Sequence, residues 1–310
     1  MRTLQKLMVG LDFTAMDDTL IRYTAFLSQV LKIEKVYFVH VVKPFELPES
    51  LREELGSEPP RGEKIRHLMA GKVSEYFDAN NRADVEVLLK EGDPLKELLE
   101  ASAALHTDTM LVGRKLKLHG SGVLTHKLLR ISKVGIIFVP EAFEPQLRRV
   151  VVSMDFSEYS ILALQHVLQA AASGPDLAII CLHVYAVPTG YRTLGMSYEE
   201  FNQRMRGFAI DKYEQLLARF PALQQSGRLL LVKAEREHQE DTGELIVLEA
   251  KRARADMLVV GARGKSAAAQ FILGSTTEKI LRFDLDIPLA VYKKEDESHN
   301  LLDSFLSSYY

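Results

Sequence analysis

The chain has 310 residues, of which 47% are hydrophobic and 26% are charged, and its formal net charge is −3. This length is typical of two domains, and the composition is that of an ordinary globular protein. The charge does not favour a general binder of nucleic acid or of anionic membranes. One cysteine, Cys181, excludes an internal disulfide and a cysteine-based zinc site. No signal peptide or membrane-spanning run is recognisable, which favours a cytoplasmic location.

Strands and helices are predicted to alternate along the first half. Short apolar runs predict five strands, at residues 6–12, 35–42, 84–92, 109–113 and 135–140. Helical spacing of apolar residues predicts the segments between them to be helices, at 17–32, about 60–81, 95–106 and about 122–131. Asp93 followed by Pro94 is typical of a helix start. The alternation indicates an α/β fold with a parallel sheet that carries helices on both faces.

The second half repeats the first. Residues 9–13 match 152–156, and Asp12 and His40 are 28 residues apart, as are Asp155 and His183. Each half closes with Lys-x-Leu-Arg and a last apolar strand. The repeat indicates a tandem duplication of the five-stranded α/β unit, with an insert at 188–228 in the second copy. We expect two domains and a tail, at 1–142, 148–294 and 295–310.

A glycine-rich loop follows the fourth strand of the second half. Gly261 and Gly264 are followed after nine residues by Gly274, which precedes Ser275 and Thr276. Glycine permits positive φ and lets backbone N–H groups approach a ligand, and a helix N-terminus favours phosphate. Arg263, Lys265 and Ser266 add possible anion donors. The spacing is neither that of a P-loop nor that of the dinucleotide fingerprint.

This loop, together with Asp155 after the first strand, the His-Val pair of the second strand and the duplicated layout, resembles the universal stress protein family. The resemblance covers about residues 1–140 and 148–293. It implies a Rossmann-like fold, similar to that of the adenine nucleotide alpha hydrolases, in each half. It also implies that ATP or a related adenine nucleotide, with or without Mg²⁺, binds in the second half. The halves are expected to pair through their last strands, as single-domain members do in homodimers.

Residue by residue, the resemblance implies that Asp155 lies beside the adenine or ribose and that the backbone near Val184 contacts the adenine edge. The phosphates would be held by the loop and the helix start, at Gly261, Arg263, Gly264, Gly274, Ser275 and Thr276. A structural alternative for Asp155 is the N-cap of the helix that follows the first strand.

The first half departs from this pattern. Its loop, from Gly113 to Gly122, is four residues shorter, Leu116 replaces the turn glycine and Val123 replaces the hydroxyl of Ser275. Leucine does not readily adopt positive φ, so the phosphate cradle is expected to be lost. The loop is still cationic, which leaves a solvated basic loop or a different anion geometry open. We expect the first half to be a structural or interaction domain.

Other candidates favour structural roles. His40 and His183 have no recognisable nucleophile partner and are expected to be packed and hydrogen-bonded. The stretch from Asp241 to Glu244 is typical of a helix cap rather than of a metal site. In the tail, the apolar residues have helical spacing, so either a short amphipathic helix or frayed chain is expected, at Leu301, Leu302, Phe305 and Leu306.

The leading functional hypothesis is a nucleotide-binding regulatory protein of the stress response. No catalytic residue or metal ligand is assigned, because a Walker lysine, a magnesium-binding carboxylate pair and a positioned base are all missing, and at most slow ATP hydrolysis is expected. The first alternative is a nucleotide-free interaction protein that acts through a protein partner. A hydrolase or transferase is the second. Neither nucleic acid nor a membrane is expected as a partner.

Overall fold

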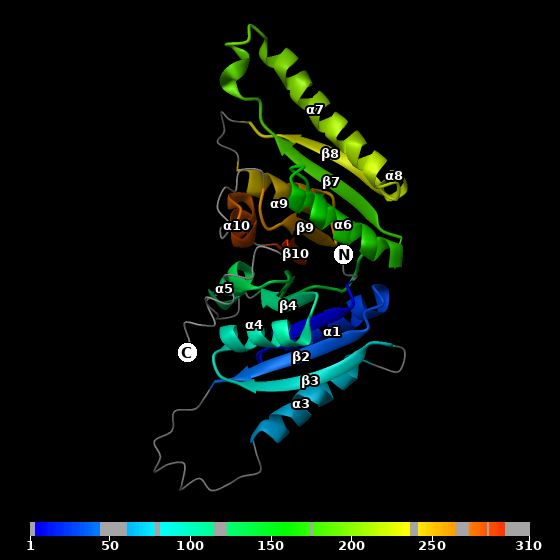
Figure 1. Ribbon diagram of the computed structural model, residues 1–310, viewed down its shortest axis with the longest axis vertical. Coiled ribbons are helices and arrows are strands. Elements are labelled where there is room, and N and C mark those ends of the chain that lie inside the picture. The colour runs from blue at the N-terminus through cyan, green and yellow to red at the C-terminus, as the bar shows by residue number, and fades with distance from the viewer. Residues whose placement is uncertain are drawn as a thin grey trace. The chain divides into compact units, whose positions relative to one another are not determined.

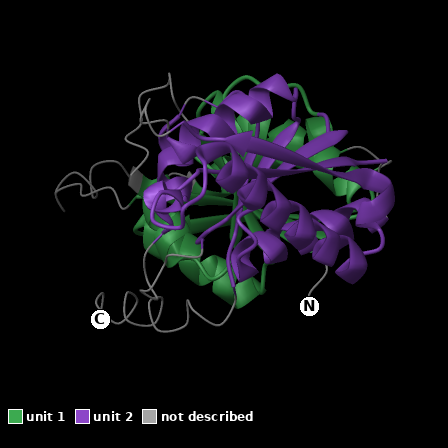
Figure 2. Ribbon diagram, turned by 90° about the horizontal axis from the view of Figure 1, so that it is seen from above, with its two compact units in different colours: residues 1–145, 295–310 green, residues 146–294 purple. Residues whose placement is uncertain are grey.

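The computed structural model describes residues 4–43, 61–77, 81–114, 123–173, 176–235, 241–264, 273–283 and 285–294. The chain divides into two compact units, the first within residues 1–145 and the second spanning Gln146–Lys294, which Figure 2 shows in different colours. The tail at 301–306 and the loop residues Lys265, Ser266, Leu116 and Gly122 lie outside the described residues.

The first unit alternates strands and helices, as Figure 1 shows. Its elements in chain order are β1 (Lys6–Leu11), α1 (Met16–Val30), β2 (Lys35–Val42), α3 (Arg61–Tyr76), β3 (Asp84–Glu91), α4 (Pro94–Leu105), β4 (Thr109–Arg114), α5 (Val123–Ile131) and β5 (Gly135–Pro140). Asp93 caps α4 by accepting a hydrogen bond from the N–H of Lys96, with Pro94 in the first turn, so the predicted helix start is confirmed.

The second unit repeats this order. Its elements are β6 (Arg149–Ser153), α6 (Glu158–Ser173), β7 (Ala178–Tyr185), η1 (Thr189–Tyr191), α7 (Tyr198–Arg219), α8 (Leu223–Ser226), β8 (Gly227–Lys233), α9 (Thr242–Arg252), β9 (Met257–Gly261), α10 (Ser275–Arg282) and β10 (Leu289–Tyr292). The second and third strands are joined by connections of equal length, residues 43–83 in the first unit and 186–226 in the second. Helix α3 lies in the first connection and helix α7 in the second, so the predicted insert is wrong. Asp241 accepts hydrogen bonds from the N–H groups of Gly243 and Glu244, which confirms the predicted cap of α9.

Each unit contains a parallel sheet whose strand order reverses at its first strand. The order is β3-β2-β1-β4-β5 in the first unit and β8-β7-β6-β9-β10 in the second. Every pair between these neighbours is parallel. Right-handed crossovers then place the helices before the reversal on one face and those after it on the other. The predicted doubly wound α/β fold is confirmed.

The central strands form the core of each unit because they are buried on both faces. Val150, Val151 and Val152 of β6 and Leu258 and Val259 of β9 are almost completely shielded from solvent. The edge strands β3 and β8 are only half-buried. Among the described residues, none of the helices is both long and apolar enough to span a membrane.

Candidate functional site

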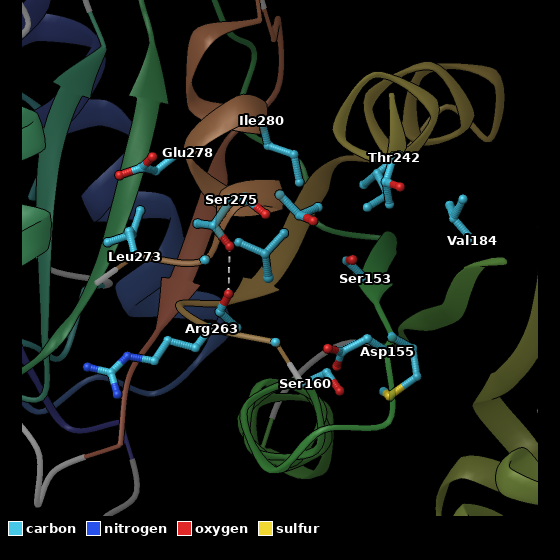
Figure 3. Close-up of a pocket in the computed structure, with 18 of the residues that line it drawn as sticks. Ser153, Asp155, Ser160, Val184, Thr242, Arg263, Leu273, Ser275, Glu278 and Ile280 are labelled. Atoms are coloured by element: carbon cyan, nitrogen blue, oxygen red, sulfur yellow. Dashed lines mark hydrogen bonds between the residues drawn. The ribbon is translucent and has the colours of Figure 1, made fainter. Parts of the chain in front are cut away.

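A crevice opens in the second unit where the strand order reverses. The pairing of β6 with β9 ends at Val152 and Val259, whereas β6 stays paired with β7 one residue further. The residues beyond these pairs therefore separate and leave space at the carboxyl ends of the strands. A cavity of about 670 Å³ lies there, shown in Figure 3. Ligand pockets in proteins have volumes of about 300–1,000 Å³.

All eight residues singled out in the sequence border this one cavity: Asp155, Val184, Gly261, Arg263, Gly264, Gly274, Ser275 and Thr276. They come from four segments that are up to about 120 residues apart in the chain. The lining also contains residues that the sequence did not single out for binding, among them Ser153, Ser160, Thr242, Ile246 and Leu273.

Asp155 lies against the backbone of the glycine loop. Its Oδ1 accepts a hydrogen bond from the N–H of Ser157 at 2.9 Å, and a Cβ added to Gly264 would lie 2.6 Å from its Oδ2. The loop can approach this carboxylate closely only because residue 264 has no side chain. Asp155 and Gly264 therefore lie in close contact beside the cavity.

The N-cap of α6 is a different residue. Ser157 directly precedes Glu158, the first residue of α6. Its Oγ accepts a hydrogen bond from the N–H of Ser160 at 3.3 Å. The structural alternative for Asp155, the cap of this helix, is therefore wrong. Because Ser157 satisfies the helix end, capping does not account for the carboxylate of Asp155 beside the cavity.

The glycines of the loop are required by space rather than by positive φ. The φ of Gly264 lies outside the left-handed region, so the prediction that this position needs positive φ is wrong. A Cβ on Gly261 would lie 2.7 Å from Cβ and 2.8 Å from the carbonyl carbon of Tyr159. Gly261 therefore permits β9 to pack closely against α6, which is a requirement of the fold.

The two ends of the loop are joined to each other. The N–H of Gly274 donates to the carbonyl oxygen of Ala262 at 2.9 Å. One turn later, the buried hydroxyl of Thr277 donates to the carbonyl oxygen of Gly261 at 2.9 Å. A Cβ on Gly274 would lie 3.2 Å from the Cα of Arg263, which is a tight contact. These contacts hold the start of α10 against the end of β9.

Replacing Thr277 by valine is expected to loosen this junction. The substitution keeps the shape of the side chain but leaves the carbonyl of Gly261 without its buried donor, at a cost of about 1–2 kcal/mol. Urea unfolding followed by circular dichroism measures the loss. Thr277→Ser restores the hydroxyl and should recover most of it, and equal stability of wild type and Thr277→Val would contradict this role.

The start of α10 offers backbone N–H groups to the cavity. Its N-cap is Gly274, which has no side chain and makes no side-chain capping bond. By contrast, side chains cap α7 and α9, at Ser197 and Asp241. The first N–H groups of a helix have no partner within the helix, and they carry a partial positive charge. This cavity therefore contains a helix N-terminus suited to an anion.

The side chain of Arg263 points away from the cavity. Figure 3 shows it extending to the side opposite Asp155 and Ser153. Its guanidinium lies 5.7 Å from the ring centre of Tyr159, and its Nη1 donates to the Tyr159 hydroxyl at 3.3 Å. In this arrangement the backbone of Arg263, rather than its charge, borders the cavity.

The repeated Asp-Phe and His-Val motifs form one structural unit in each half. Phe13 and Phe156 both have φ near +60°, which is rare for a bulky residue. The Phe156 ring lies 4.9 Å from the ring of His183, whose Nδ1 donates to the carbonyl of Met154 at 2.6 Å. His40 donates in the same way to Leu11, at 2.9 Å. The prediction of packed, hydrogen-bonded histidines is confirmed, although His183 also borders the cavity.

The corresponding place in the first unit is acidic. Asp17, the counterpart of Ser160, is buried and accepts hydrogen bonds from the N–H groups of Asp12 and Phe13. Burial raises the pKa of Asp17, and the nearby Asp12 carboxylate adds to the shift. The first unit thus has two carboxyl groups at this place, Asp12 and Asp17, whereas the second unit has only Asp155. The additional acid disfavours binding of a polyphosphate. Met16 fills the space beside Gly113, with Cγ 2.4 Å from an added Cβ.

The carboxylates of the lining do not converge. Asp155 and Glu278 both border the cavity, but Figure 3 shows Glu278 directed away from Asp155. Within the part of the chain that the structure describes, no group of three or more His, Cys, Asp or Glu side chains could hold a metal. Magnesium usually binds one or two carboxylates together with substrate phosphates. Asp155 alone fits magnesium only as a companion of a bound phosphate.

The missed lining residues had weak signals in the sequence. Ser153 ends β6 two residues before Asp155, and Thr242 follows the cap of α9, so their positions follow from the strand ends. The apolar residues Ile246 and Leu273 carry no local pattern that distinguishes a cavity wall from a core. Cys181 is buried in the core of the second unit, and burial raises its pKa to about 12.

Comparison with known proteins agrees with this fold. The second unit is a doubly wound α/β fold with a crevice where the strand order reverses and a helix N-terminus beside it. This arrangement is typical of a class of ligand-binding folds. Residues 146–293 match the universal stress protein family. The second half of the chain is therefore a domain of that family. The comparison with curated proteins gave no match.

Solved structures share the fold over the length of the chain. A universal stress protein from Archaeoglobus fulgidus DSM 4304 has 19% identity and a TM-score of 0.64, and the match covers 93% of this chain and 98% of that one. A functionally unknown protein from Pseudomonas aeruginosa PAO1 has 10% identity and a TM-score of 0.66, with 98% of both chains covered. A universal stress protein solved in complex with cAMP covers 46% of this chain and 100% of its own, at 15% identity and a TM-score of 0.35.

Proposed function

We propose that this protein binds ATP or a related adenine nucleotide in its second half and acts as a regulatory protein in the stress response. One observation carries the proposal. The start of α10 and Asp155 border the same cavity. The N-cap residue of α10 is Gly274, so no capping side chain covers the first N–H groups of this helix. A phosphate chain and a ribose need these two kinds of group at opposite ends of one site.

In the proposed complex, the phosphates lie at the backbone N–H groups between Gly264 and Thr276. Backbone donors at a helix N-terminus bind phosphate without a lysine or an arginine. The carboxylate of Asp155 accepts a hydrogen bond from a ribose hydroxyl, and the backbone near Val184, at the end of β7, contacts the adenine edge. Ser153, next to these strand ends, adds a hydroxyl to the same wall.

The proposed role is binding and signalling rather than efficient catalysis. Among the described lining residues, His183 is a candidate for a general base. Its Nδ1 is already hydrogen-bonded to the carbonyl of Met154. Rapid phosphoryl transfer needs a positioned base or water and charge compensation at the transferred group. We therefore expect regulation through the bound nucleotide, with a protein partner that reads the bound state.

A nucleotide-free interaction protein is the second candidate. The observation in its favour is Gly261, because close packing against Tyr159 explains this glycine without any ligand. Gly264 is different, since its neighbour is the carboxylate of Asp155 rather than a helix backbone. The two candidates therefore differ in whether Asp155 contributes to ligand binding.

Calorimetric titration with ATP is expected to give one site per chain. Asp155→Ala should weaken binding about tenfold or more, because a hydrogen bond to a charged group contributes about 1.5–3 kcal/mol. Asp12→Ala is the matched control in the first unit and should leave the affinity unchanged. Adenosine, which lacks phosphates, should bind more weakly than ATP.

Three results would count against the proposal. No binding by the wild type at millimolar ATP would favour the nucleotide-free candidate. Two equal sites per chain, or a loss caused by Asp12→Ala, would show that the first unit binds nucleotide as well. Phosphate release with many turnovers per hour would instead make the protein a hydrolase.

A further inference from the structure

The first turn of α9 forms part of the cavity wall. Thr242 and Ile246 both border the cavity, because residues four apart lie on the same face of a helix. Ile246 is buried, whereas Thr242 is exposed. The described residues provide no hydrogen-bond partner for the Thr242 hydroxyl. This hydroxyl is therefore available to a ligand in the cavity.

The corresponding helix of the first unit begins with proline instead. Asp93 caps α4 and Asp241 caps α9, and the residues that follow the caps are Pro94 and Thr242. Asp241 has a ψ of 127°, which is the conformation expected of a residue before proline, so proline would also fit at position 242. Proline is favoured in the first turn of a helix, and threonine is a weak helix former. Helix formation therefore does not explain the threonine.

A second difference between the units fixes this turn beside α10. Position 243 is glycine, whereas the first unit has Leu95 at the corresponding position. A Cβ on Gly243 would lie 3.0 Å from the Cβ of Lys279 and 3.3 Å from the carbonyl oxygen of Thr276, and both contacts would be tight. The carboxylate of Asp241 also forms an ion pair with Lys279. These contacts hold the first turn of α9 in a defined place against the start of α10.

Thr242 lies at the end of the cavity where the proposed complex has the base. Helix α9 packs against β7, and Figure 3 shows Thr242 on the same side of the cavity as Val184. The carboxylate of Glu244, in the same helix turn, disfavours a phosphate here. Ile246 adds an apolar surface to this wall, which suits the flat face of a base. A neutral, flat group with polar atoms on its edge therefore fits beside Thr242.

We propose that Thr242 determines base specificity in the nucleotide site, through a hydrogen bond between its hydroxyl and the adenine base. This role rests on the proposed function and adds a side-chain contact to the backbone contact near Val184. A hydroxyl can donate to a ring nitrogen of adenine or accept from its amino group. Guanine has an acceptor where adenine has its amino donor, so a guanine held by the same backbone would present different groups to Thr242.

Calorimetric titration of the full-length chain with ATP, AMP and GTP tests this role. Thr242→Val keeps the shape of the side chain but removes the hydroxyl. It should weaken ATP and AMP by the same factor, about three- to tenfold, because the lost hydrogen bond is to the base that both share. GTP binding should change much less, so the preference for ATP over GTP should fall. Thr242→Ser keeps the hydroxyl and should retain most of the affinity for ATP.

Two proline variants compare the units directly. Thr242→Pro copies the first unit and should bind ATP as weakly as Thr242→Val does, while its urea unfolding midpoint equals or exceeds that of the wild type. Pro94→Thr is the matched control, since it places the same hydroxyl on α4, and it should leave the ATP affinity and the number of sites unchanged. A lower unfolding midpoint in Thr242→Pro would overturn the inference that this threonine serves the ligand rather than the helix.

The outcomes separate this role from the proposed function. If Asp155→Ala weakens ATP binding but Thr242→Val does not, the role of Thr242 is overturned and the proposed function stands. Equal weakening of ATP, AMP and GTP by Thr242→Val would indicate a structural effect, and weakening of ATP without AMP would indicate a phosphate contact. Either result would overturn base recognition by Thr242. A wild type that does not bind ATP would overturn both proposals.

Discussion

Gly264→Val is expected to abolish ATP binding while the second unit remains folded. A Cβ at this position would lie 2.6 Å from Oδ2 of Asp155, so the side chain must displace the carboxylate from the cavity. The variant thereby loses both the close backbone approach at the loop and the hydrogen bond of Asp155 to the ribose. The loss of the charged hydrogen bond alone corresponds to about 10–100-fold in affinity. Calorimetric titration with ATP measures it.

Two controls separate this effect from general damage. Gly190→Ala adds a methyl group where an added Cβ meets no atom within 4 Å, so it should bind ATP like the wild type. The second control is a double-mutant cycle on stability. Gly264→Ala should destabilise the protein by about 1–3 kcal/mol in the wild type and by less in the Asp155→Ala background, where the clash is absent. If the costs of the two substitutions were additive, the contact between Gly264 and Asp155 would be contradicted. If Gly264→Val bound ATP as tightly as the wild type, the proposed nucleotide site would be contradicted.

Gly261→Ala is expected to lower stability much more than Gly113→Ala does, although the two glycines are counterparts. The Cβ at 261 would meet the backbone of Tyr159 at 2.8 Å, and this backbone cannot move without a shift of α6. The Cβ at 113 would meet only the side chain of Met16, which is flexible. We expect costs of about 3 kcal/mol and about 1 kcal/mol respectively.

Chemical unfolding of the two variants measures this difference. Hydrogen exchange followed by mass spectrometry assigns the loss to the correct unit, because peptides from residues 149–185 and from 6–42 report separately. In the Gly261→Ala variant, protection should fall in the second unit alone. Equal costs for both variants, or a loss of protection in the first unit of Gly261→Ala, would contradict the packing argument.

Much of the fold could be predicted because the chain contains two copies of one pattern. The buried central strands are continuous apolar runs, and Asp93-Pro94 and Asp241 are strong helix starts. Strand ends then identify the edge of the sheet where a ligand binds, and these ends point to Asp155 and the glycine loop.

The reasons for individual residues were harder to predict. The need for glycine at 264 comes from a contact with Asp155, which is more than 100 residues away in the chain, and no local pattern reports such a contact. Ser157 rather than Asp155 caps α6, because the helix begins at Glu158. A sequence pattern does not locate a helix end to within one or two residues. The direction of the Arg263 side chain depends on stacking with Tyr159, which only the tertiary structure creates.

Helix α7 was missed as an element although its start is well marked. Ser197 and Glu200 form a capping box, in which each side chain accepts a hydrogen bond from the backbone of the other residue. Helix α7 is the counterpart of α3, since both lie between the second and third strands of their units. The prediction of an insert left this segment out of the comparison of repeats, which guided the other assignments. A search for capping boxes in residues 188–228 would have found the helix.

The junction between β9 and α10 has a consequence for how this protein can evolve. Ala262 and Gly274 are hydrogen-bonded to each other, and Gly261 and Thr277 close the same junction one turn later. These bonds fix the end of β9 and the start of α10 to each other. A glycine loop of this kind in the first half would lie next to the buried Asp17, so acquiring a second nucleotide site would also require losing that acid.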